Sequence, residues 1–362
     1  MNENGKVKKN KIFMVIPIVI FATIAIVVLS NMNLNPLVYK TSHMKEVAAH
    51  LQGGKNYSIY DPNINWRALR REQIKMLDET PQVVVSGGSR WQEAAFHHVE
   101  GMSFFNAHGH SDYNEDFFAI VELLESNNRI PETLVLSLRY RIFEPVELRS
   151  HTGWREWAPE YRAMAKKIGI EAHSSSATSK KDHWMALLSL SDLWALIQRK
   201  LNSEDAPKAI DSDTTPTLDV IGFDGSLRWS EANATRFSPE YAEKDAEKRL
   251  KRFVDFDLQI EQKMVSDVDK LLAYTQEKGI NIVLAQTPFH PTFYDGIQDT
   301  NFGRTLAKVD EIGDEYAEKY GLQKVGSFNP HELECPKSEF IDWHHGTPEC
   351  LAKVFDQIDF TQ

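Results

Sequence analysis

The stretch PQVVVSGGSRW, residues 81–91, determines how the rest of the chain is interpreted. Three consecutive valines predict a short strand, the two glycines after it permit a tight turn, and a helix is predicted next, over WQEAAFHHV. A serine at such a turn has its hydroxyl near a helix N-terminus, where N–H groups favour developing negative charge. Ser89 is therefore either a nucleophile or an ordinary helix N-cap, and this stretch alone favours the N-cap.

Further strands are predicted over residues 102–109, 132–140, 279–289 and 322–328, with helical patterns between them, including a long one over 241–278. The run ETLVLSLRY, residues 132–140, is almost continuously apolar, which is typical of a strand buried on both faces of a parallel sheet. Alternation of this kind predicts an α/β fold, a three-layer sandwich with a mostly parallel sheet. Ligands of such sheets bind at the C-terminal ends of the strands, where Ser89, His108 to His110, Arg139 to Arg141 and Gln286 to His290 fall.

The N-terminus carries a different signal. Residues 12–30 are free of charge and long enough to span most of a hydrocarbon core of about 30 Å. Four lysines precede them, which predicts a cytoplasmic N-terminus, and the apolar run exceeds that of a cleaved signal peptide and lacks its cleavage site. The expected organisation is a basic tail (1–11), a transmembrane anchor (12–30), a juxtamembrane stem (31–60) and an α/β domain (61–362) with a helical insertion at about 145–240.

Charge and cysteine content restrict the function. After Ser30 the chain holds 37 of its 41 basic and 51 of its 52 acidic residues, a formal charge of −14, which argues against a nucleic-acid partner. The two cysteines, Cys335 and Cys350, are a candidate disulfide in an oxidising compartment and two free thiols in a reducing one.

The stretch FIDWHHGTPE, residues 340–349, supplies a carboxylate and two histidines just before a predicted terminal helix. Asp342 and His345 are three residues apart, so they lie on one side of a helical turn or tight loop. A carboxylate there can orient an imidazole that takes a hydroxyl proton. The alternative is a polar loop in which Asp342 caps its own backbone, and His344 is a rival base whose side chain should diverge from that of His345.

These motifs resemble a known family. GGSR after the first strand, a glycine after the second and D-x-x-H before a C-terminal helix are similar to the SGNH (GDSL-like) hydrolase superfamily. With the N-terminal apolar segment, the chain looks most like its membrane-anchored branch around alginate O-acetyltransferase and DltD-like proteins. The resemblance implies Ser89 as nucleophile, His345 as base and Asp342 as its orienting acid, with the N–H groups of Ser89 and Gly109 as oxyanion donors.

The resemblance also implies a setting. It implies acyl-ester transfer or hydrolysis outside the cytoplasmic membrane, on a cell-envelope or exported polysaccharide, with a membrane-bound O-acyltransferase as a candidate acyl donor and no cofactor. One departure matters: SLRY puts Arg139 where the family often has the asparagine of G-x-N-D. An arginine can donate to an oxyanion or hold an acidic group, or it can mark an altered or lost activity.

Other residues are candidates for substrate binding. Arg90 beside the nucleophile, and His290 and Tyr294 in TPFHPTFYD, could line an acyl or sugar pocket, although a loop that only packs against the sheet is as consistent with this pattern. Trp154 and Trp157 are sugar-stacking candidates by residue type, but tryptophans more often pack in the core.

Two other functions compete. HGHSD, residues 108–112, resembles the H-x-H-x-D motif of metallo-β-lactamase-like hydrolases and could ligate zinc, but Tyr113 stands where that motif needs a histidine. A non-catalytic scaffold or polymer-binding subunit is the other alternative. Arg139 supports it, whereas an intact serine, histidine and aspartate set argues against it.

Overall fold

The computed structural model of the chain describes residues 36–59, 64–109, 113–148, 153–173, 209–210, 219–230, 238–254, 256 and 258–361. The chain forms two units, Met1–His43 with Ser174–Lys208, and Met44–His173 with Ala209–Gln362. Only part of one helix is described in the first unit, so the account below concerns the second. The predicted anchor, residues 12–30, lies outside the described residues. Within the described ranges no helix is both long and apolar enough to cross a membrane.

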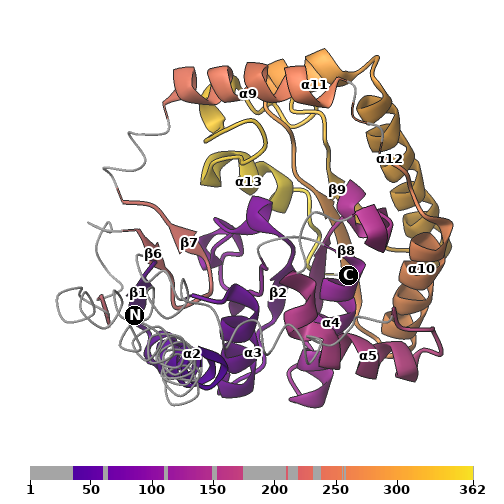
Figure 1. Ribbon diagram of the computed structural model, residues 1–362. Helices are drawn as coiled ribbons and strands as arrows, with labels where there is room; N and C mark the ends of the chain where they lie inside the picture. Colours follow the sequence, from indigo (N-terminus) through magenta and orange to yellow (C-terminus); the bar gives the residue numbers. More distant parts are fainter. Residues whose placement is uncertain are drawn as a thin grey trace, which may run out of the picture. The chain divides into compact units, whose positions relative to one another are not determined.

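A five-stranded parallel sheet forms the centre of this unit (Figure 1). Its strands are β2 (Val83–Ser86), β3 (Phe104–Asn106), β4 (Thr133–Ser137), β8 (Asn281–Gln286) and β9 (Gln323–Gly326), in the spatial order β3-β2-β4-β8-β9. Each neighbouring pair is parallel, so all five C-terminal ends lie at one edge. The predicted α/β class with a parallel sheet is therefore confirmed.

Alternate residues of the strands pack on opposite faces of the sheet. Val84, Leu134 and Ile282 belong to one apolar core, together with residues of α4 (Asn114–Ser126), α10 (Gln262–Glu277) and α12 (Asn301–Tyr320). Val83, Val85 and Val135 belong to a second core, together with residues of α13 (Pro348–Phe355) and with Trp91. The period-two alternation of the strands thus produces three layers.

A second, antiparallel sheet lies partly in the predicted helical insertion. It contains β1 (Asn56–Ser58), β5 (Ala209–Ile210), β6 (Val220–Ile221) and β7 (Leu227–Arg228), in the order β5-β1-β6-β7. The insertion at 145–240 is therefore not purely helical in its described part, which also holds α5 (Ala158–Lys167). Strands of two residues are too short to show a period in sequence.

The predicted stem is also partly folded into this unit. α2 (Pro36–Gln52) buries Met44, Val47 and Leu51, whose helical spacing forms an apolar stripe, and β1 follows it. Residues 44–58 are therefore part of the α/β unit and not a juxtamembrane stem.

The helix predicted directly after Ser89 is replaced by two short 3₁₀ turns, η1 (Ser89–Trp91) and η2 (Phe96–His98). Asn106 of β3 contacts these turns: its side-chain amide donates to the carbonyls of Trp91 (2.7 Å) and Ala94 (2.8 Å), and the Trp91 carbonyl also accepts the Ala94 N–H (3.0 Å).

Other boundaries also differ from prediction. The long pattern over 241–278 forms two helices, α9 (Pro239–Phe253) and α10. At the start of α4 the N-cap is Tyr113, whose N–H donates to Asp116 Oδ2. The remaining described elements are α3 (Trp66–Met76), α11 (Pro291–Ile297), η3 (Tyr140–Phe143), η4 (Val146–Leu148), η5 (Gly153–Trp157) and η6 (Lys337–Glu339).

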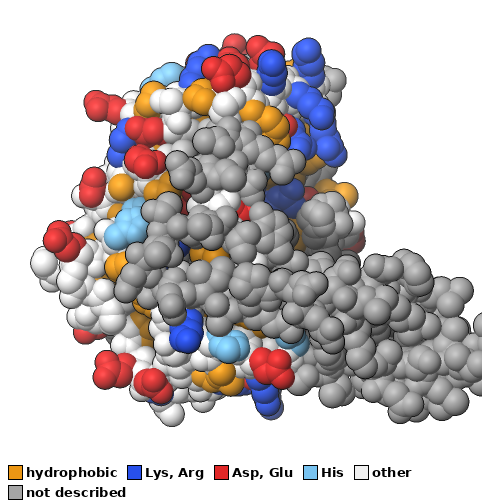
Figure 2. Space-filling view, turned by 90° about the vertical axis from the view of Figure 1, so that its left-hand side faces the viewer, with side chains coloured by type: hydrophobic (Ala, Val, Ile, Leu, Met, Phe, Trp, Pro, Cys, Tyr) orange, Lys and Arg blue, Asp and Glu red, His pale blue; other side chains and the backbone are white. Residues whose placement is uncertain are grey.

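On the face shown in Figure 2, acidic and basic side chains lie side by side at the top of the view.

Candidate active site

The turn after β2 carries the predicted nucleophile. Ser89 begins η1 and is partly buried, two glycines after the last residue of β2. Gly87 has no room for a side chain, because a Cβ there would lie 2.5 Å from Trp91 Cδ1 and 2.8 Å from Ser137 Cβ. The glycine therefore lets the chain turn directly over the buried Trp91, and the turn lifts Ser89 to the C-terminal edge of the sheet.

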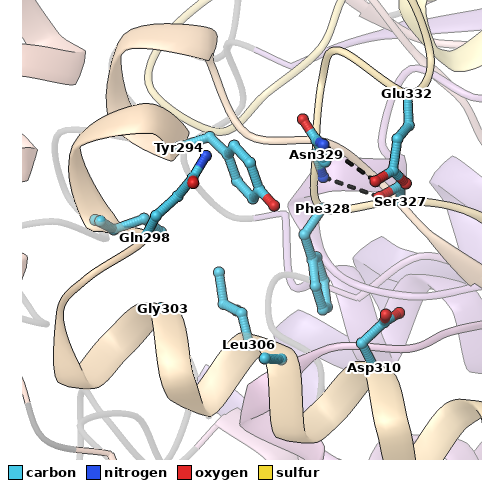
Figure 3. A pocket seen from close by; sticks show the side chains of 11 residues that line it. Tyr294, Gln298, Gly303, Leu306, Asp310, Ser327, Phe328, Asn329 and Glu332 are labelled. Carbon is cyan, nitrogen blue, oxygen red and sulfur yellow. Dashed lines mark hydrogen bonds between the residues drawn. The ribbon is translucent and has the colours of Figure 1, made fainter.

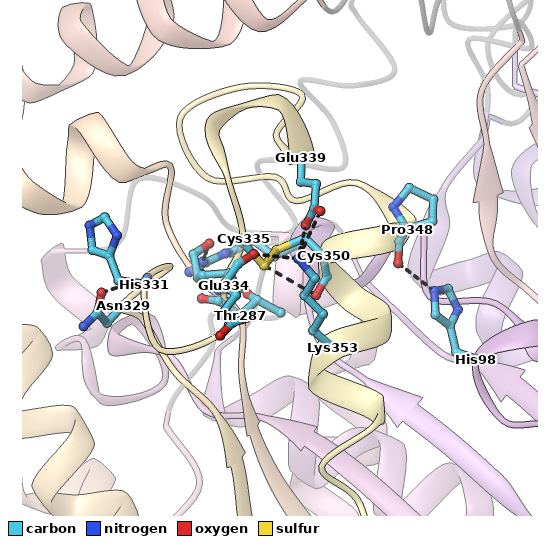
Figure 4. Close-up of a disulfide and its surroundings, with 12 residues drawn as sticks. His98, Thr287, Asn329, His331, Glu334, Cys335, Glu339, Pro348, Cys350 and Lys353 are labelled. Carbon is cyan, nitrogen blue, oxygen red and sulfur yellow. Dashed lines mark hydrogen bonds and ion pairs between the residues drawn. A yellow bond between two sulfur atoms is a disulfide. The ribbon is translucent and has the colours of Figure 1, made fainter.

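The second part of the site is a closed loop before α13. Phe340 and Gly346 pair as an antiparallel bridge, and the Ile341 N–H donates to the His345 carbonyl at 2.9 Å. The disulfide Cys335–Cys350 joins the chain on either side of this loop (Figure 4). The loop is thus fixed at its base by hydrogen bonds and by a covalent link.

Asp342 has two functions in this loop. Its Oδ1 accepts the backbone N–H groups of His344 and His345, each at 2.9 Å, and its Oδ2 lies 2.7 Å from His345 Nδ1. The local capping role and the orienting role were alternatives in the sequence, but one carboxylate performs both. Holding the backbone of His345 also fixes the position from which its ring extends.

His345 connects the two parts of the site, because its Nε2 lies 2.8 Å from Ser89 Oγ. Burial alone would raise the pKa of Asp342, but its interactions with the imidazoles of His345 and His344 hold that pKa far below its ordinary value. An ionised carboxylate can only accept, so Nδ1 of His345 carries the proton and Nε2 is left to accept from the Ser89 hydroxyl. This is the arrangement that activates a serine for nucleophilic attack.

The side chain of the rival base, His344, was expected to diverge from that of His345, and this expectation is wrong. Its Nδ1 lies 3.2 Å from Asp342 Oδ1, and its ring lies between those of Trp343 and His345, with centroid distances of 4.2 and 3.9 Å. Burial lowers the pKa of His344 well below its ordinary value; the Asp342 carboxylate opposes this shift, and the positive charge of Arg139 adds to it. His344 is therefore neutral and buttresses the loop, while His345 contacts the serine.

The predicted oxyanion donors differ in availability. The Ser89 N–H meets no acceptor among the described residues, as expected at a helix start. The Gly109 N–H instead donates to the Gly87 carbonyl at 2.7 Å, so its predicted role is not available in this structure. The cause is the sheet ladder, which continues past the end of β3 through Ala107 N–H to the Val85 carbonyl (2.8 Å).

Arg139 follows β4, the neighbour of β2 in the sheet, and only 5% of its surface is exposed. Its positive charge acts on His344, and its guanidinium lies 5.3 Å from the Tyr140 ring centre. The arginine thus lies within electrostatic range of the loop 340–346. Its role as an oxyanion or acidic-group ligand remains a prediction.

Two predicted substrate ligands are buried in the protein. Arg90 is 2% exposed, donates to the carbonyls of Thr287 and Pro288, and packs on the Phe289 ring at 4.2 Å. His290 has no exposed surface, and its Nδ1 accepts the Thr292 N–H. Both side chains are therefore enclosed by protein in this structure, and their role in substrate binding stays a prediction.

Arg90 and His290 instead contribute to the loop after β8: Arg90 donates to carbonyls of this loop, and His290 is part of it. The His290 N–H donates at 3.1 Å to the carbonyl of Trp343, the residue between Asp342 and His344 in the sequence. Burial lowers the pKa of His290, so this histidine is neutral at physiological pH. The loop after β8 is therefore hydrogen-bonded to the loop 340–346.

The aromatic candidates are placed elsewhere. Tyr294 lines a cavity of about 290 Å³, but none of Ser89, Asp342 and His345 lines it (Figure 3). Trp157 is 1% exposed and donates from Nε1 to the Arg67 carbonyl at 2.8 Å, which makes it a packing residue. The side chain of Trp154 lies outside the described residues.

Within the described ranges, Asp342, His344 and His345 bring three potential metal ligands within 4.8 Å of one another. Both Asp342 oxygens and both His345 nitrogens already make the hydrogen bonds described above, so this set fits a proton relay better than a metal site. The other such group, Cys335, Glu339 and Cys350, has both sulfurs in the disulfide.

The zinc-like motif at 108–112 is described only in part, since His110 and Asp112 lie outside the described residues. His108 is 2% exposed, and its Nδ1 lies 3.0 Å from the Arg70 guanidinium. A fixed cation at that distance opposes the binding of a metal ion to this nitrogen.

Sequence reasoning missed two buried residues of the site. Asn106 is fully buried and ties β3 to the nucleophile turn, a role that its position at a strand end could have indicated. Glu93 is 5% exposed and accepts from Trp229 Nε1 at 2.9 Å; burial, with the charges of Glu349 and Asp342, raises its pKa to about 8. No local signal marks Glu93, because Trp229 comes from the insertion.

In comparisons with known proteins, no protein-family model matches the chain and no relative is found among curated proteins. The resemblance to SGNH hydrolases therefore depends on the short motifs and on the geometry of the site. Any functional assignment has to be argued from the arrangement of Ser89, His345 and Asp342.

Proposed function

We propose that the protein catalyses serine-dependent transfer or hydrolysis of a small acyl ester. The observation that carries this proposal is the continuous hydrogen-bonded set from Ser89 Oγ through His345 (2.8 Å) to Asp342 (2.7 Å). In the first step, Ser89 Oγ bonds to the acyl carbon while its proton passes to His345 Nε2 and then to the leaving alkoxide. In the second, the oxygen of water or of an acceptor hydroxyl bonds to the acyl carbon and gives its proton to His345, which passes it to Ser89 Oγ as the bond between the acyl carbon and Oγ breaks.

We further propose that the chain is an SGNH-like protein, singly anchored in the cytoplasmic membrane, which acts on an envelope or exported glycan. The apolar segment 12–30 with its preceding lysines supports the anchor and its orientation. The Cys335–Cys350 disulfide supports an oxidising, extracytoplasmic compartment. In this setting a membrane-bound O-acyltransferase is the natural source of acyl groups. The chemistry needs no cofactor.

A second candidate, a non-catalytic SGNH-like scaffold that binds a polymer, is favoured by two observations. The Gly109 N–H is engaged by the Gly87 carbonyl, and Arg139 stands where the family often has asparagine. An active site of this type needs donors aimed at the developing oxyanion. The two candidates therefore differ in whether Ser89 reacts.

The test is covalent labelling of the full-length protein with a fluorophosphonate, which phosphonylates an activated serine. We expect labelling of the wild type that is lost in Ser89→Ala and His345→Ala. Labelling that is unaffected by a chelator would distinguish serine chemistry from metal-assisted hydrolysis. Ser103→Ala is the matched control, since Ser103 is exposed and its hydroxyl accepts only the Gln82 N–H among the described residues.

The outcome separates the two candidates. Absence of labelling in a folded wild type would favour the scaffold, and Arg139→Asn would then be the first variant to test for recovered reactivity. Labelling that persists in Ser89→Ala would place the reactive serine elsewhere and would refute the proposed site.

A further inference from the structure

The cavity beside Tyr294 lies between α11, α12 and the segment that follows β9 (Figure 3). Its volume of about 290 Å³ is at the lower end of small-molecule pockets, which range from roughly 300 to 1,000 Å³. Gly303 allows the start of α12 to lie against the end of α11, because a Cβ there would collide with the Ile297 carbonyl oxygen. The cavity is therefore built by the fold and suits one small cyclic group.

The floor of this cavity is apolar and partly aromatic. Leu306 and Phe328 are buried, Tyr294 is half-buried, and all three side chains point toward the cavity in Figure 3. Aromatic rings and aliphatic side chains pack well against the C–H face of a sugar ring. The floor is thus suited to a ring that is apolar on its face and polar at its edge.

Polar groups surround this floor. Glu332 and Gln298 are exposed at the rim, and Asn329 donates to Glu332 Oε1 at 3.0 Å. The Ser327 hydroxyl in turn accepts the Asn329 N–H at 3.0 Å, which fixes the turn that carries Asn329. The Tyr294 hydroxyl and the Gln298 amide make no hydrogen bond to any described residue, so both can bond to the hydroxyl groups of a ligand.

The charge of the cavity is negative. Glu332 and Asp310 line it, whereas no lysine or arginine is among its lining residues. Asp310 pairs with Lys324 at 2.6 Å, but that lysine is shared with Asp314, also at 2.6 Å. Burial raises the pKa of Tyr294, and the charges of Glu332, Asp310 and Asp295 raise it further. A uronate or a phosphate would be repelled here, and a protonated amine would be attracted.

We propose that this cavity binds a single sugar residue that carries a protonated amine, with the ring against Tyr294 and Phe328 and the amine toward Glu332. The inference uses no feature of the serine site and holds whether or not Ser89 reacts. If both proposals hold, the cavity identifies the class of the acceptor polymer as an amine-bearing glycan, bound at the same edge of the sheet as the nucleophile.

The experiment is calorimetric titration of the full-length protein at about pH 6, where amines are protonated. The probes are glucosamine tetramer, its neutral N-acetylated form and a galacturonate tetramer. We expect the glucosamine tetramer to bind at least about ten-fold more tightly than the N-acetylated form, and the galacturonate tetramer not to bind. Glu332→Gln should weaken binding of the amine form about ten-fold, and Tyr294→Ala should abolish it.

The matched control is Glu311→Gln, the same charge change one residue from Asp310 on α12, at a side chain that does not line the cavity. Equal affinity for the amine and the neutral tetramer would overturn the proposal, as would binding that survives both cavity variants or the absence of any binding. Ser89→Ala should bind the tetramer as the wild type does, so a failure of the serine chemistry and a failure of this inference are distinguishable.

Discussion

Replacing Asp342 by asparagine tests the proton relay at its most specific contact. The asparagine carbonyl can still accept the two backbone N–H groups that Asp342 Oδ1 accepts at 2.9 Å, so the loop should keep its shape. The amide NH₂ would then face His345 Nδ1 at the position of Oδ2, 2.7 Å away. An amide donor requires Nδ1 to accept, so the imidazole proton moves to Nε2, which can no longer take the Ser89 proton.

The expected loss follows from that change of tautomer. Where an aspartate orients a catalytic histidine, its replacement by asparagine lowers kcat by about 10⁴-fold, which corresponds to roughly 5 kcal/mol of transition-state stabilisation. The stability should change by only about 1 kcal/mol, because one hydrogen bond is altered and the capping bonds persist. The assay is the initial rate of p-nitrophenyl acetate hydrolysis, with the fluorophosphonate labelling rate as a second measure.

The chain offers a matched control for this substitution. Asp295 forms an exposed aspartate–histidine pair with His331 at 2.8 Å, and Asp295→Asn should leave both rates unchanged. Asp342→Ala should additionally lower the melting temperature, because it removes the two capping bonds. A loss of less than ten-fold in a folded Asp342→Asn protein would refute the assignment of Asp342 as the residue that orients His345.

Three further predictions concern the supports of the site. Gly87→Ala places a methyl group against two buried side chains, so the free energy of unfolding in urea should fall by about 1–3 kcal/mol and the labelling rate should fall with it. Replacing Cys335 and Cys350 by serine opens a link of sequence separation 15, which should cost about 3 kcal/mol of stability by calorimetry. Burial holds the pKa of Glu93 at about 8 instead of 4.5. Between these pH values the folded protein keeps a proton that the unfolded chain has lost, so the free energy of unfolding falls as the pH rises. Glu93→Gln removes this loss, so the melting temperature of the variant relative to wild type should increase from about pH 5 to about pH 8.

Each of these has its own control. Gly53→Ala should be tolerated, since the nearest atom to its added Cβ is 3.4 Å away, and an equally stable Gly87→Ala would contradict the packing described. Reduced wild type should match the double serine variant, and any difference would show that the substitutions act other than through the disulfide. Parallel stability curves for wild type and Glu93→Gln would mean that Glu93 titrates near its ordinary pKa.

Local sequence was sufficient where a short pattern had a single physical interpretation. The valine run of β2 and the apolar run of β4 predict buried parallel strands because no polar side chain interrupts them. The three-residue spacing of Asp342 and His345 predicts a shared side of the loop, and the structure has Oδ2 and Nδ1 in contact. The α/β class and both halves of the candidate site were therefore predictable.

Contacts between distant segments were decided only by tertiary structure. Asn106 ties the turns after Ser89 to β3 through two hydrogen bonds, and the continued β2–β3 ladder uses the Gly109 N–H. Arg90 and His290 look like ligands in sequence, yet Arg90 is buried against the loop after β8 and His290 is buried as part of that loop. The two-residue strands β6 and β7 exist because other strands pair with them.

The sequence by itself determined the chemistry available to this protein: a serine at a strand end, a paired aspartate and histidine, and two cysteines on either side of that pair. Those properties depend on neighbours within a few residues, which periodicity and turn chemistry can specify. The tertiary structure decided which groups meet, bringing His345 Nε2 to 2.8 Å from a serine 256 residues away, and which hydrogen-bonding groups remain free. That choice depends on packing between distant segments, and no local pattern encodes it.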